Sequence, residues 1–268
     1  ANIRLFCYNI IMSIAINLEK TRKVFFKKRI PEPKVMERVE HDVFEKASQE
    51  NYKRWMVPLV DDALERFEKN NKKDNLKILD IACGPGLLTK ELGERSAKFS
   101  VFGLDNSKYA LKLAKKNCRD LLRRKRVFLK LASAYNIPFS NDYFDLVICK
   151  DSLHHFDNLR LSLKEMFRVI KPTGMIYVQD LKRDLPWYLL KMAIPPDTPF
   201  KKLQYYSARA SYTKKEVAGV LKKLGVKKYF IQTRKITDKL GSRYQKIGIN
   251  LLQLKAAFQS RFVAVFYK

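Results

Sequence analysis

A glycine-containing turn near residue 80 is the feature of the sequence best suited to binding a ligand. Residues 78–86 read ILDIACGPG. Gly84 and Gly86 lack Cβ atoms, so the backbone can turn sharply and a ligand can approach closely. A helix that begins at about Leu87 would present unpaired N–H donors at its first turn. We therefore expect a nucleotide-like ligand here, although a structural turn that binds no ligand has the same pattern.

Asp105 strengthens this expectation because it ends the next β-rich run, VFGLD. An acidic residue at that position can accept hydrogen bonds from both ribose hydroxyls of a nucleoside bound over the first turn. Its alternative role is that of an N-cap or loop acid. The turn reads GPG rather than G-x-G-x-x-G, which disfavours a phosphate-bearing dinucleotide.

From Leu76 onward, short β-rich runs alternate with longer amphipathic segments. This alternation predicts an α/β fold with a doubly wound, mostly parallel, seven-stranded Rossmann-like sheet. The run KILDIA is almost uniformly apolar, as expected of a central strand buried on both faces. Expected strands cover residues 77–82, 99–104, 127–131, 144–149, 175–179, 226–232 and 261–267, and expected helices cover 52–67, 87–95, 108–117, 159–169 and 213–224.

The chain divides into an N-terminal helical cap at 1–73 and the Rossmann-like domain at 74–268, which carries a lid insertion at about 181–212. Residues 185–200 are Pro-rich and apolar, so we expect irregular structure there. The apolar run 5–16 is too short to span a bilayer and lacks a small-residue cleavage site. With the basic segment that follows, it suits either packing over the site or peripheral contact with an anionic membrane.

The charge balance is strongly basic, with 55 Lys and Arg against 27 Asp and Glu and a formal net charge of +28. Such a surface attracts nucleic acid, acidic lipids or phosphorylated metabolites, but a Lys-rich composition without a specific partner explains it as well. Cys7, Cys83, Cys118 and Cys149 are scattered. With no CxxC pair and no His cluster at metal-ligand spacing, we expect no metal, no disulfide framework and a cytoplasmic protein.

Four segments between residues 76 and 180 resemble the class I S-adenosylmethionine-dependent methyltransferases, especially the ubiquinone and menaquinone biosynthesis group. In order, they read ILDIACGPG, VFGLDNSKYALKLAKKN, ASAYNIPFSNDYFDLVICKDSLHHF and LKEMFRVIKPTGMIYVQDL. The resemblance implies an enzyme with S-adenosyl-L-methionine as its cofactor. It says almost nothing about the methyl acceptor.

The resemblance also implies roles for single residues at the cofactor. Asp80 would face the ammonium of the methionine portion, and Asp105 would hold the ribose. Ser133 stands where the family commonly carries an acid for the adenine amino group; a hydroxyl can still accept that hydrogen bond. The complete expected cofactor set is Asp80, Ala82, Gly84, Gly86, Asp105, Asn106, Ser133, Ala134 and Lys150.

In this family the segment DSLHHF borders the transferring methyl group. If the acceptor is a hydroxyl, His154 or His155 could remove its proton, although one of the two can equally be structural. Aromatic and cationic side chains outside the motifs are candidates for binding a planar or lipid-like acceptor with an anionic group. The expected acceptor set is Tyr52, Trp55, Tyr205, Tyr206 and Arg209.

Three functions remain open from the sequence. The first is methyl transfer to a small, anionic or amphipathic metabolite. The second is methylation of RNA, for which the basic charge would supply phosphate contacts. The third is a binding or scaffold protein that keeps the fold without catalysis, because fold alone does not prove chemistry.

Overall fold

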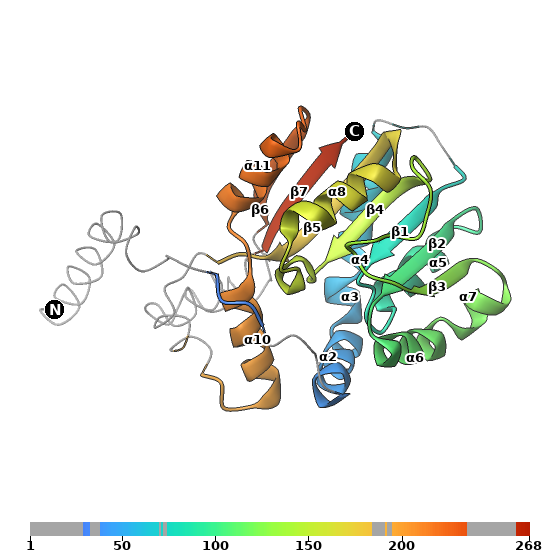
Figure 1. Cartoon of the computed structure of the whole chain (residues 1–268). Helices are drawn as coiled ribbons and strands as arrows, with labels where there is room; N and C mark the ends of the chain where they lie inside the picture. The colour runs from blue at the N-terminus through green and yellow to red at the C-terminus, as the bar shows by residue number, and fades with distance from the viewer. Residues whose placement is uncertain are drawn as a thin grey trace, which may run out of the picture.

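The computed structural model describes residues 29–32, 38–69, 71, 74–183, 191, 195–234 and 261–268 (Figure 1). The apolar run 5–16 and most of the Pro-rich stretch lie outside these residues, so the expectations for them stay predictions. Within the described part of the chain, no helix has the length and apolar character needed to cross a membrane.

A single seven-stranded sheet forms the centre of the molecule, with strand order β3-β2-β1-β4-β5-β7-β6. The first five strands pair in parallel, and β7 runs antiparallel to both of its neighbours. The predicted doubly wound, mostly parallel sheet is confirmed. The strands are β1 (Lys77–Ile81), β2 (Ser100–Asp105), β3 (Val127–Leu131), β4 (Phe144–Lys150), β5 (Ile170–Leu181), β6 (Tyr229–Arg234) and β7 (Arg261–Tyr267).

Helices cover both faces of this sheet (Figure 1). Because successive side chains of a strand point to opposite faces, Leu79 and Ile81 pack in the core beneath α8 and α11, whereas Ile78 packs in the core beneath α4, α5 and α7. The helices are α2 (Arg38–Glu50), α3 (Tyr52–Trp55), α4 (Val57–Glu68), α5 (Leu87–Arg95), α6 (Lys108–Asn117), α7 (Arg119–Arg123), η1 (Leu153–His155, a 3-10 turn), α8 (Leu159–Val169), α10 (Pro199–Ala210) and α11 (Lys214–Lys223).

The helix expected at 52–67 is two helices, because α3 ends at Trp55 and α4 begins at Val57 with a proline in its first turn. Four residues of α4, namely Leu59, Val60, Ala63 and Phe67, are buried in the same core cluster as β1. α4 therefore packs on the sheet together with Ile78 of β1, and the expected division at residue 73 stays a prediction. In this part of the chain, α4 covers the sheet, whereas α2 contacts α6 and α10.

Most elements lie within one residue of the expected bounds, but β6 covers Tyr229–Arg234 instead of 226–232, and two further elements differ more. β5 begins at Ile170 instead of 175, because Phe144 pairs with Ile170 across an irregularity in the register that absorbs the turn-like residues Pro172 and Gly174. α10 lies inside the expected lid insertion. Its start has a recognisable signal, since the Thr198 side chain caps the helix and Pro199 occupies the first turn.

The sheet order reverses between β1 and β4, and the crevice beyond the carboxyl ends of such strands is where α/β folds bind ligands. Two residues without glycine's freedom have left-handed backbone at this edge, Ala82 with φ 53° after β1 and Asp151 with φ 47° after β4. α10 lies beyond this edge, where it contacts both α2 and η1 (Figure 1).

Candidate functional site

A cavity of about 620 Å³ lies at the carboxyl edge of the sheet. Residues from the ends of β1, β2 and β4 form its floor, and residues of α2 and α10 cover it. This size is in the range of pockets that bind small ligands. Its two ends differ in construction: Asp80, residues 82–85 and residues 105–107 form the glycine-loop end, and Glu32, residues 154–157 and α10 form the histidine end.

The loop after β1 is held to β2 by backbone hydrogen bonds. Cys83 N–H donates to the Leu104 carbonyl at 3.0 Å, and Gly86 N–H donates back to the Cys83 carbonyl at 3.0 Å. Gly84 has φ 53°, and a Cβ added to it would meet no atom within 4 Å. The Gly84 backbone therefore lines open space, which is the close approach that a bound ligand requires.

At Gly86, packing against a neighbouring helix requires a glycine. With φ 76°, a Cβ there would lie 2.8 Å from the Ala114 Cβ of α6. Gly86 is outside the cavity lining, so its expected place beside a cofactor stays a prediction. Its observed role is the close packing of α5 against α6.

Asp105 joins the glycine loop to β2. One carboxylate oxygen accepts a hydrogen bond from Gly84 N–H at 2.8 Å, and the other accepts one from Ser107 N–H at 2.8 Å. The side chain is buried but lines the cavity. A carboxylate has about four acceptor positions. Two therefore remain for ligand hydroxyls after the loop has been fixed.

Asp80 lies deeper, beneath this loop, and accepts a hydrogen bond from the Thr89 hydroxyl at 2.6 Å. Burial raises the pKa of Asp80 to about 7, aided by the charge of Asp105 and opposed by the Thr89 bond and by the charge of Lys150. A ligand cation placed against Asp80 would favour its ionised form.

The remaining expected cofactor residues also line the cavity, with the single exception of Gly86. They are Ala82, Asn106, Ser133, Ala134 and Lys150. The Ser133 hydroxyl accepts a hydrogen bond from Tyr135 N–H at 3.1 Å in a tight turn. It retains a proton to donate and a second lone pair, so it can still meet the edge of a base.

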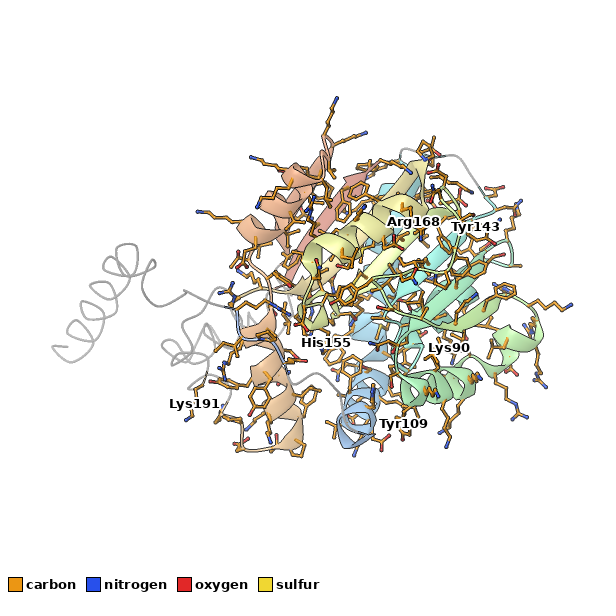
Figure 2. The ribbon with its side chains drawn as sticks, viewed as in Figure 1. Lys90, Tyr109, Tyr143, His155, Arg168 and Lys191 are labelled. Atoms are coloured by element: carbon orange, nitrogen blue, oxygen red, sulfur yellow. The ribbon has the colours of Figure 1, made fainter. Side chains whose placement is uncertain are left out.

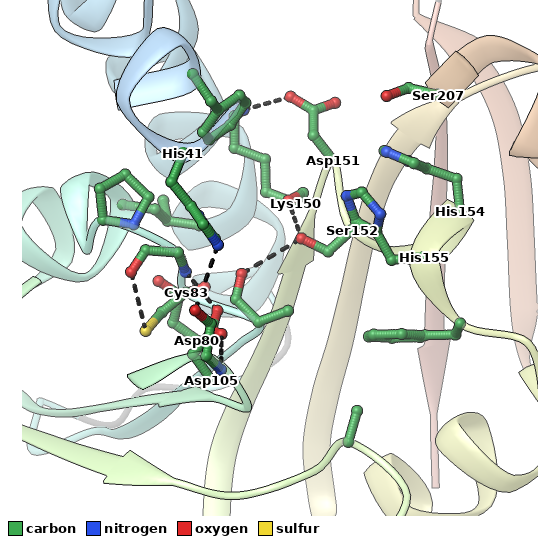
Figure 3. A pocket seen from close by; sticks show the side chains of 18 of the residues that line it. His41, Asp80, Cys83, Asp105, Lys150, Asp151, Ser152, His154, His155 and Ser207 are labelled. Atoms are coloured by element: carbon green, nitrogen blue, oxygen red, sulfur yellow. Dashed lines mark hydrogen bonds and ion pairs between the residues drawn. The ribbon is translucent and has the colours of Figure 1, made fainter. Parts of the chain in front are cut away.

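A buried ion network lies between the two ends of the cavity (Figure 3). Asp151 pairs with Lys150 and with Arg261 of β7, whose Nε lies 2.7 Å from Asp151 Oδ1. Burial alone would raise the pKa of Asp151, but the charges of Arg261 and Lys150 lower it strongly. The Lys150 ammonium also faces the ring of Trp55 at 5.8 Å from its centroid.

At the histidine end, His154 is bound to Asp180, the buried penultimate residue of β5. His154 Nδ1 lies 2.7 Å from Asp180 Oδ1, and His154 N–H donates to Asp180 Oδ2 at 2.9 Å. Burial lowers the pKa of an imidazole, but the charge of Asp180 and its hydrogen bond outweigh this and raise the pKa of His154. The pair fixes the ring and leaves Nε2 unbound by Asp180.

His155 lies beside His154, close to α10, and has a carboxylate partner from the N-terminal region (Figure 2). Its Nδ1 is 2.7 Å from Glu32 Oε2. Burial alone would raise the pKa of Glu32, but the hydrogen bond and charge of His155, with the charge of His154, lower it to about 2. Glu32 is thus an anion inside the cavity.

Arg29 fastens this N-terminal segment across the cavity. Its guanidinium donates to the Ala210 carbonyl and to the His154 carbonyl, both at 2.6 Å. The same group lies 4.5 Å from the centroid of the Tyr212 ring. Residues 29–32 therefore connect the end of α10 with η1.

Four of the five expected acceptor residues lie outside the cavity lining, and only Trp55 is part of it. The Tyr52 hydroxyl donates to Glu91 of α5 at 2.5 Å, so its polar end contacts protein. Arg209 stacks on Tyr205 at 5.3 Å, and Tyr205 packs against Tyr206. α10 instead lines the cavity with Phe200, Leu203, Gln204 and Ser207.

Sequence reasoning did not identify Glu32, Asp151, Asp180 or Arg261 as site residues. Asp180 could have been found, since an acid at the carboxyl end of β5 shares the sheet edge with the ends of β1 and β4. Glu32 and Arg261 carry no local signal, because both reach the site only through tertiary packing.

Comparisons with known proteins agree with this architecture. Residues 79–178 match the family described as "Methyltransferase domain". The demethylmenaquinone methyltransferase of Leptospira interrogans is 35% identical over 126 residues, which are 46% of this chain and 51% of that protein. The mitochondrial ubiquinone biosynthesis O-methyltransferase of Rattus norvegicus is 29% identical over 140 residues, or 50% of this chain and 40% of that protein. The chain thus spans about half the length of the curated relatives it matches.

A solved structure extends the likeness over nearly the whole chain. The plantazolicin methyltransferase BamL, in complex with a triazolic desmethylPZN analogue and SAH, has a TM-score of 0.64 at 16% sequence identity and covers 97% of this chain and 98% of its own. At that identity the likeness concerns the fold. Residues 79–178 therefore form a methyltransferase domain with the fold of the class I S-adenosylmethionine-dependent methyltransferases, and its sequence is similar to that of the ubiquinone and menaquinone biosynthesis group.

Proposed function

We propose that the chain transfers the methyl group of S-adenosylmethionine to a small, anionic or amphipathic acceptor. The observation that carries the proposal is that one cavity is lined by both Asp105, which binds the glycine loop from the end of β2, and His154, which Asp180 holds in place. Curated relatives named for demethylmenaquinone and for ubiquinone biosynthesis favour a quinone precursor as the acceptor.

The glycine-loop end fits the cofactor. Gly84 leaves a space that any Cβ would fill, beside an Asp105 carboxylate with unused acceptor positions. We assign Asp105 to the ribose hydroxyls, Asp80 to the ammonium of the methionine portion, and Ser133 with Ala134 to the adenine edge. Phosphate groups would be repelled, because two carboxylates face this end.

When bound, the sulfonium supplies the methyl group: an acceptor lone pair forms the new bond to carbon while the C–S bond breaks and its electrons stay on sulfur. The chain's part is orientation, because a correctly aligned acceptor gains most of the attainable acceleration. For a hydroxyl acceptor, His154 takes the released proton on Nε2, and Asp180 stabilises the resulting imidazolium. The apolar residues Phe200 and Leu203 of α10 would exclude water from the acceptor.

Calorimetry with S-adenosylmethionine tests the cofactor assignment. Asp105→Ala should bind about 1–3 kcal/mol more weakly, or roughly 5–150-fold, because charge-assisted hydrogen bonds are lost. Asp197→Asn, a change at an exposed acid of the segment before α10, is the matched control and should bind like wild type. Equal affinity of Asp105→Ala and wild type would refute the ribose role. Absence of binding to the wild type would favour a scaffold protein.

Turnover tests the histidine assignment separately. His154→Ala should lower methylation of a hydroxyl acceptor about 10²-fold or more, through loss of the general base, while cofactor affinity stays unchanged. The acceptor itself is found by mass spectrometry of a host extract incubated with isotope-labelled donor. Label in small molecules supports the proposal, and label confined to RNA would establish the alternative function.

A further inference from the structure

Two imidazoles and one carboxylate converge at the histidine end. The possible ligand atoms of Glu32, His154 and His155 all lie within 4.8 Å of one another. The two histidine rings are adjacent, with centroids 4.2 Å apart, and Ser207 of α10 faces them (Figure 3). Two histidines with one carboxylate is a recurrent ligand set for divalent transition metals.

His154 is oriented as a metal ligand would be. Its Nδ1 and its backbone N–H are both bound to Asp180, at 2.7 Å and 2.9 Å. Nε2 is thereby left as the coordinating atom. In metal sites the ligating histidine almost always donates its other ring N–H to a carboxylate or carbonyl, which fixes both tautomer and ring direction.

The burial of the Glu32 carboxylate is a second indication of a metal site. Its side chain is only 7% exposed, and Oε2 contacts His155 Nδ1. The other oxygen, Oε1, is buried and has no hydrogen-bond partner within the described part of the chain. Leaving a buried carboxylate oxygen unpaired is costly. The Glu32 carboxylate has His155 and the Ser207 hydroxyl as hydrogen-bonding partners, and a cation bound to Oε1 would satisfy the remaining oxygen.

The guanidinium of Arg29, which lies in the same segment as Glu32, makes its contacts elsewhere. The Arg29 guanidinium donates to the carbonyls of Ala210 and His154, and its remaining nitrogen lies 3.6 Å from Asp157. These contacts anchor the segment that carries Glu32. They position its carboxylate over the two histidines.

We propose that Glu32, His154 and His155 bind one divalent cation of the Zn²⁺ or Mn²⁺ class. Small side-chain rotations would bring the three ligand atoms to ~2.0–2.2 Å from a single ion. Three protein ligands leave further positions open to the cavity, as in catalytic metal sites. The ion would take the place of the ring proton that His155 now shares with Glu32.

The consequence for catalysis rests on the proposed function. A cation at this position binds an oxygen of the acceptor and lowers the pKa of that hydroxyl, as it does for bound water. With the ion bound, His154 Nε2 is a ligand and no longer the base, so the hydroxyl proton would pass to solvent. The acceptor oxyanion would then attack the methyl carbon with its lone pair while the C–S bond breaks and its electrons stay on sulfur. The site would therefore select acceptors with an ionisable oxygen, such as phenols or enols.

Binding of Mn²⁺, followed by electron paramagnetic resonance and calorimetry on the full chain, tests the site without any need for activity. Mn²⁺ is the probe because it discriminates against the chain's thiols. We expect one ion per chain in the wild type and an affinity at least tenfold lower in Glu32→Gln and in His154→Ala. Asp180→Asn should also weaken binding, ~10–100-fold, through the orientation of His154.

His41 provides a matched control, since the chain has three histidines and this one lines the same cavity at the glycine-loop end. His41→Gln should keep the wild-type affinity for Mn²⁺. The inference is overturned if wild type binds no ion, or if Glu32→Gln or His154→Ala binds it as tightly as wild type does. Calorimetry with S-adenosylmethionine on the same samples distinguishes the metal site from the proposed function. A chain that binds the cofactor but not Mn²⁺ would refute the metal site and leave the cofactor assignment unchanged.

Discussion

The two ends of the cavity are built by different means. At the glycine-loop end, backbone amides and short contacts between the ends of β1 and β2 fix the geometry, with Asp105 as the main side chain. At the histidine end, side chains from residues 29–32, η1 and β5 meet through ion pairs, and α10 lines the cavity beside them. A site made of backbone tolerates changes of neighbouring side chains. One made of paired charges fails when a partner is removed.

This difference assigns the ends different tasks. The glycine-loop end matches a ligand whose sugar and amino acid portions do not vary, so a fixed backbone suffices. The histidine end is lined by residues of α10 and the N-terminal segment, which lie outside the matched region 79–178. Acceptor choice can therefore change with these segments while the cofactor end is retained.

The largest expected effect comes from breaking the ion network between the ends. Asp151→Asn should destabilise the fold by about 3–5 kcal/mol, because Arg261 and Lys150 would remain charged in a largely buried site. Urea unfolding measures the change. Asp142→Asn is the control, since Asp142 also has positive φ and a lysine partner but is 46% exposed. The control should lose no more than about 1 kcal/mol, and an equal loss in both variants would contradict the account.

Alanine substitutions at Gly84 and Gly86 distinguish the effect of the loop on packing from its effect on cofactor binding. Gly86→Ala meets Ala114 at 2.8 Å and has positive φ, so it should cost about 2–4 kcal/mol of stability through overpacking and backbone strain. Gly84→Ala has the strain alone and should cost about 1–2 kcal/mol, but it places a methyl group in the cavity and should weaken cofactor binding. Urea unfolding and calorimetry report the two effects. The reverse pattern would show that Gly86 is the residue facing the ligand.

The smallest expected effect is a pH dependence at the glycine-loop end. Because burial raises the pKa of Asp80 to about 7, affinity for the cofactor's ammonium should rise roughly eightfold between pH 6 and 7.5, as the ionised fraction grows from about one tenth to about three quarters. Asp105 and Lys150 also face Asp80, so Asp80→Asn is needed to isolate it and should give a flatter profile. An unchanged slope in that variant would exclude Asp80 as the source.

The same carboxyl has a defined effect on stability. Between about pH 4 and pH 7, folded Asp80 retains a proton that the unfolded chain releases, so this residue makes the folded state less stable as pH rises through that window. Asp80→Asn should remove that contribution. Thermal unfolding across the window measures it.

The sequence sufficed for the glycine-loop end because its signals are local. An apolar strand, the turn 82–86 and an acid at the end of the next strand lie within thirty residues, and parallel pairing brings those strand ends together. The sheet could be predicted because short β-rich runs alternate with amphipathic helical segments along the chain. The βα units are short-range structures, and local patterns specify such structures well.

The histidine end could not be predicted in the same way. Glu32 and His155 are distant in the chain, and Arg261 comes from the strand inserted between β5 and β6. The aromatic residues of α10 were expected in the site because aromatic side chains suit ligands, yet a helix has several faces, and Tyr205 is buried away from the cavity. Which face turns inward depends on packing against α2 and η1, and no local pattern encodes that packing.

A crystal structure of the chain with S-adenosylhomocysteine tests the central claim most directly. We expect both ribose hydroxyls to be hydrogen-bonded to the Asp105 carboxylate, with the amino acid portion over Gly84 and the sulfur directed toward the histidine end. A nucleoside bound elsewhere, or a ribose that makes no contact with Asp105, would contradict the account.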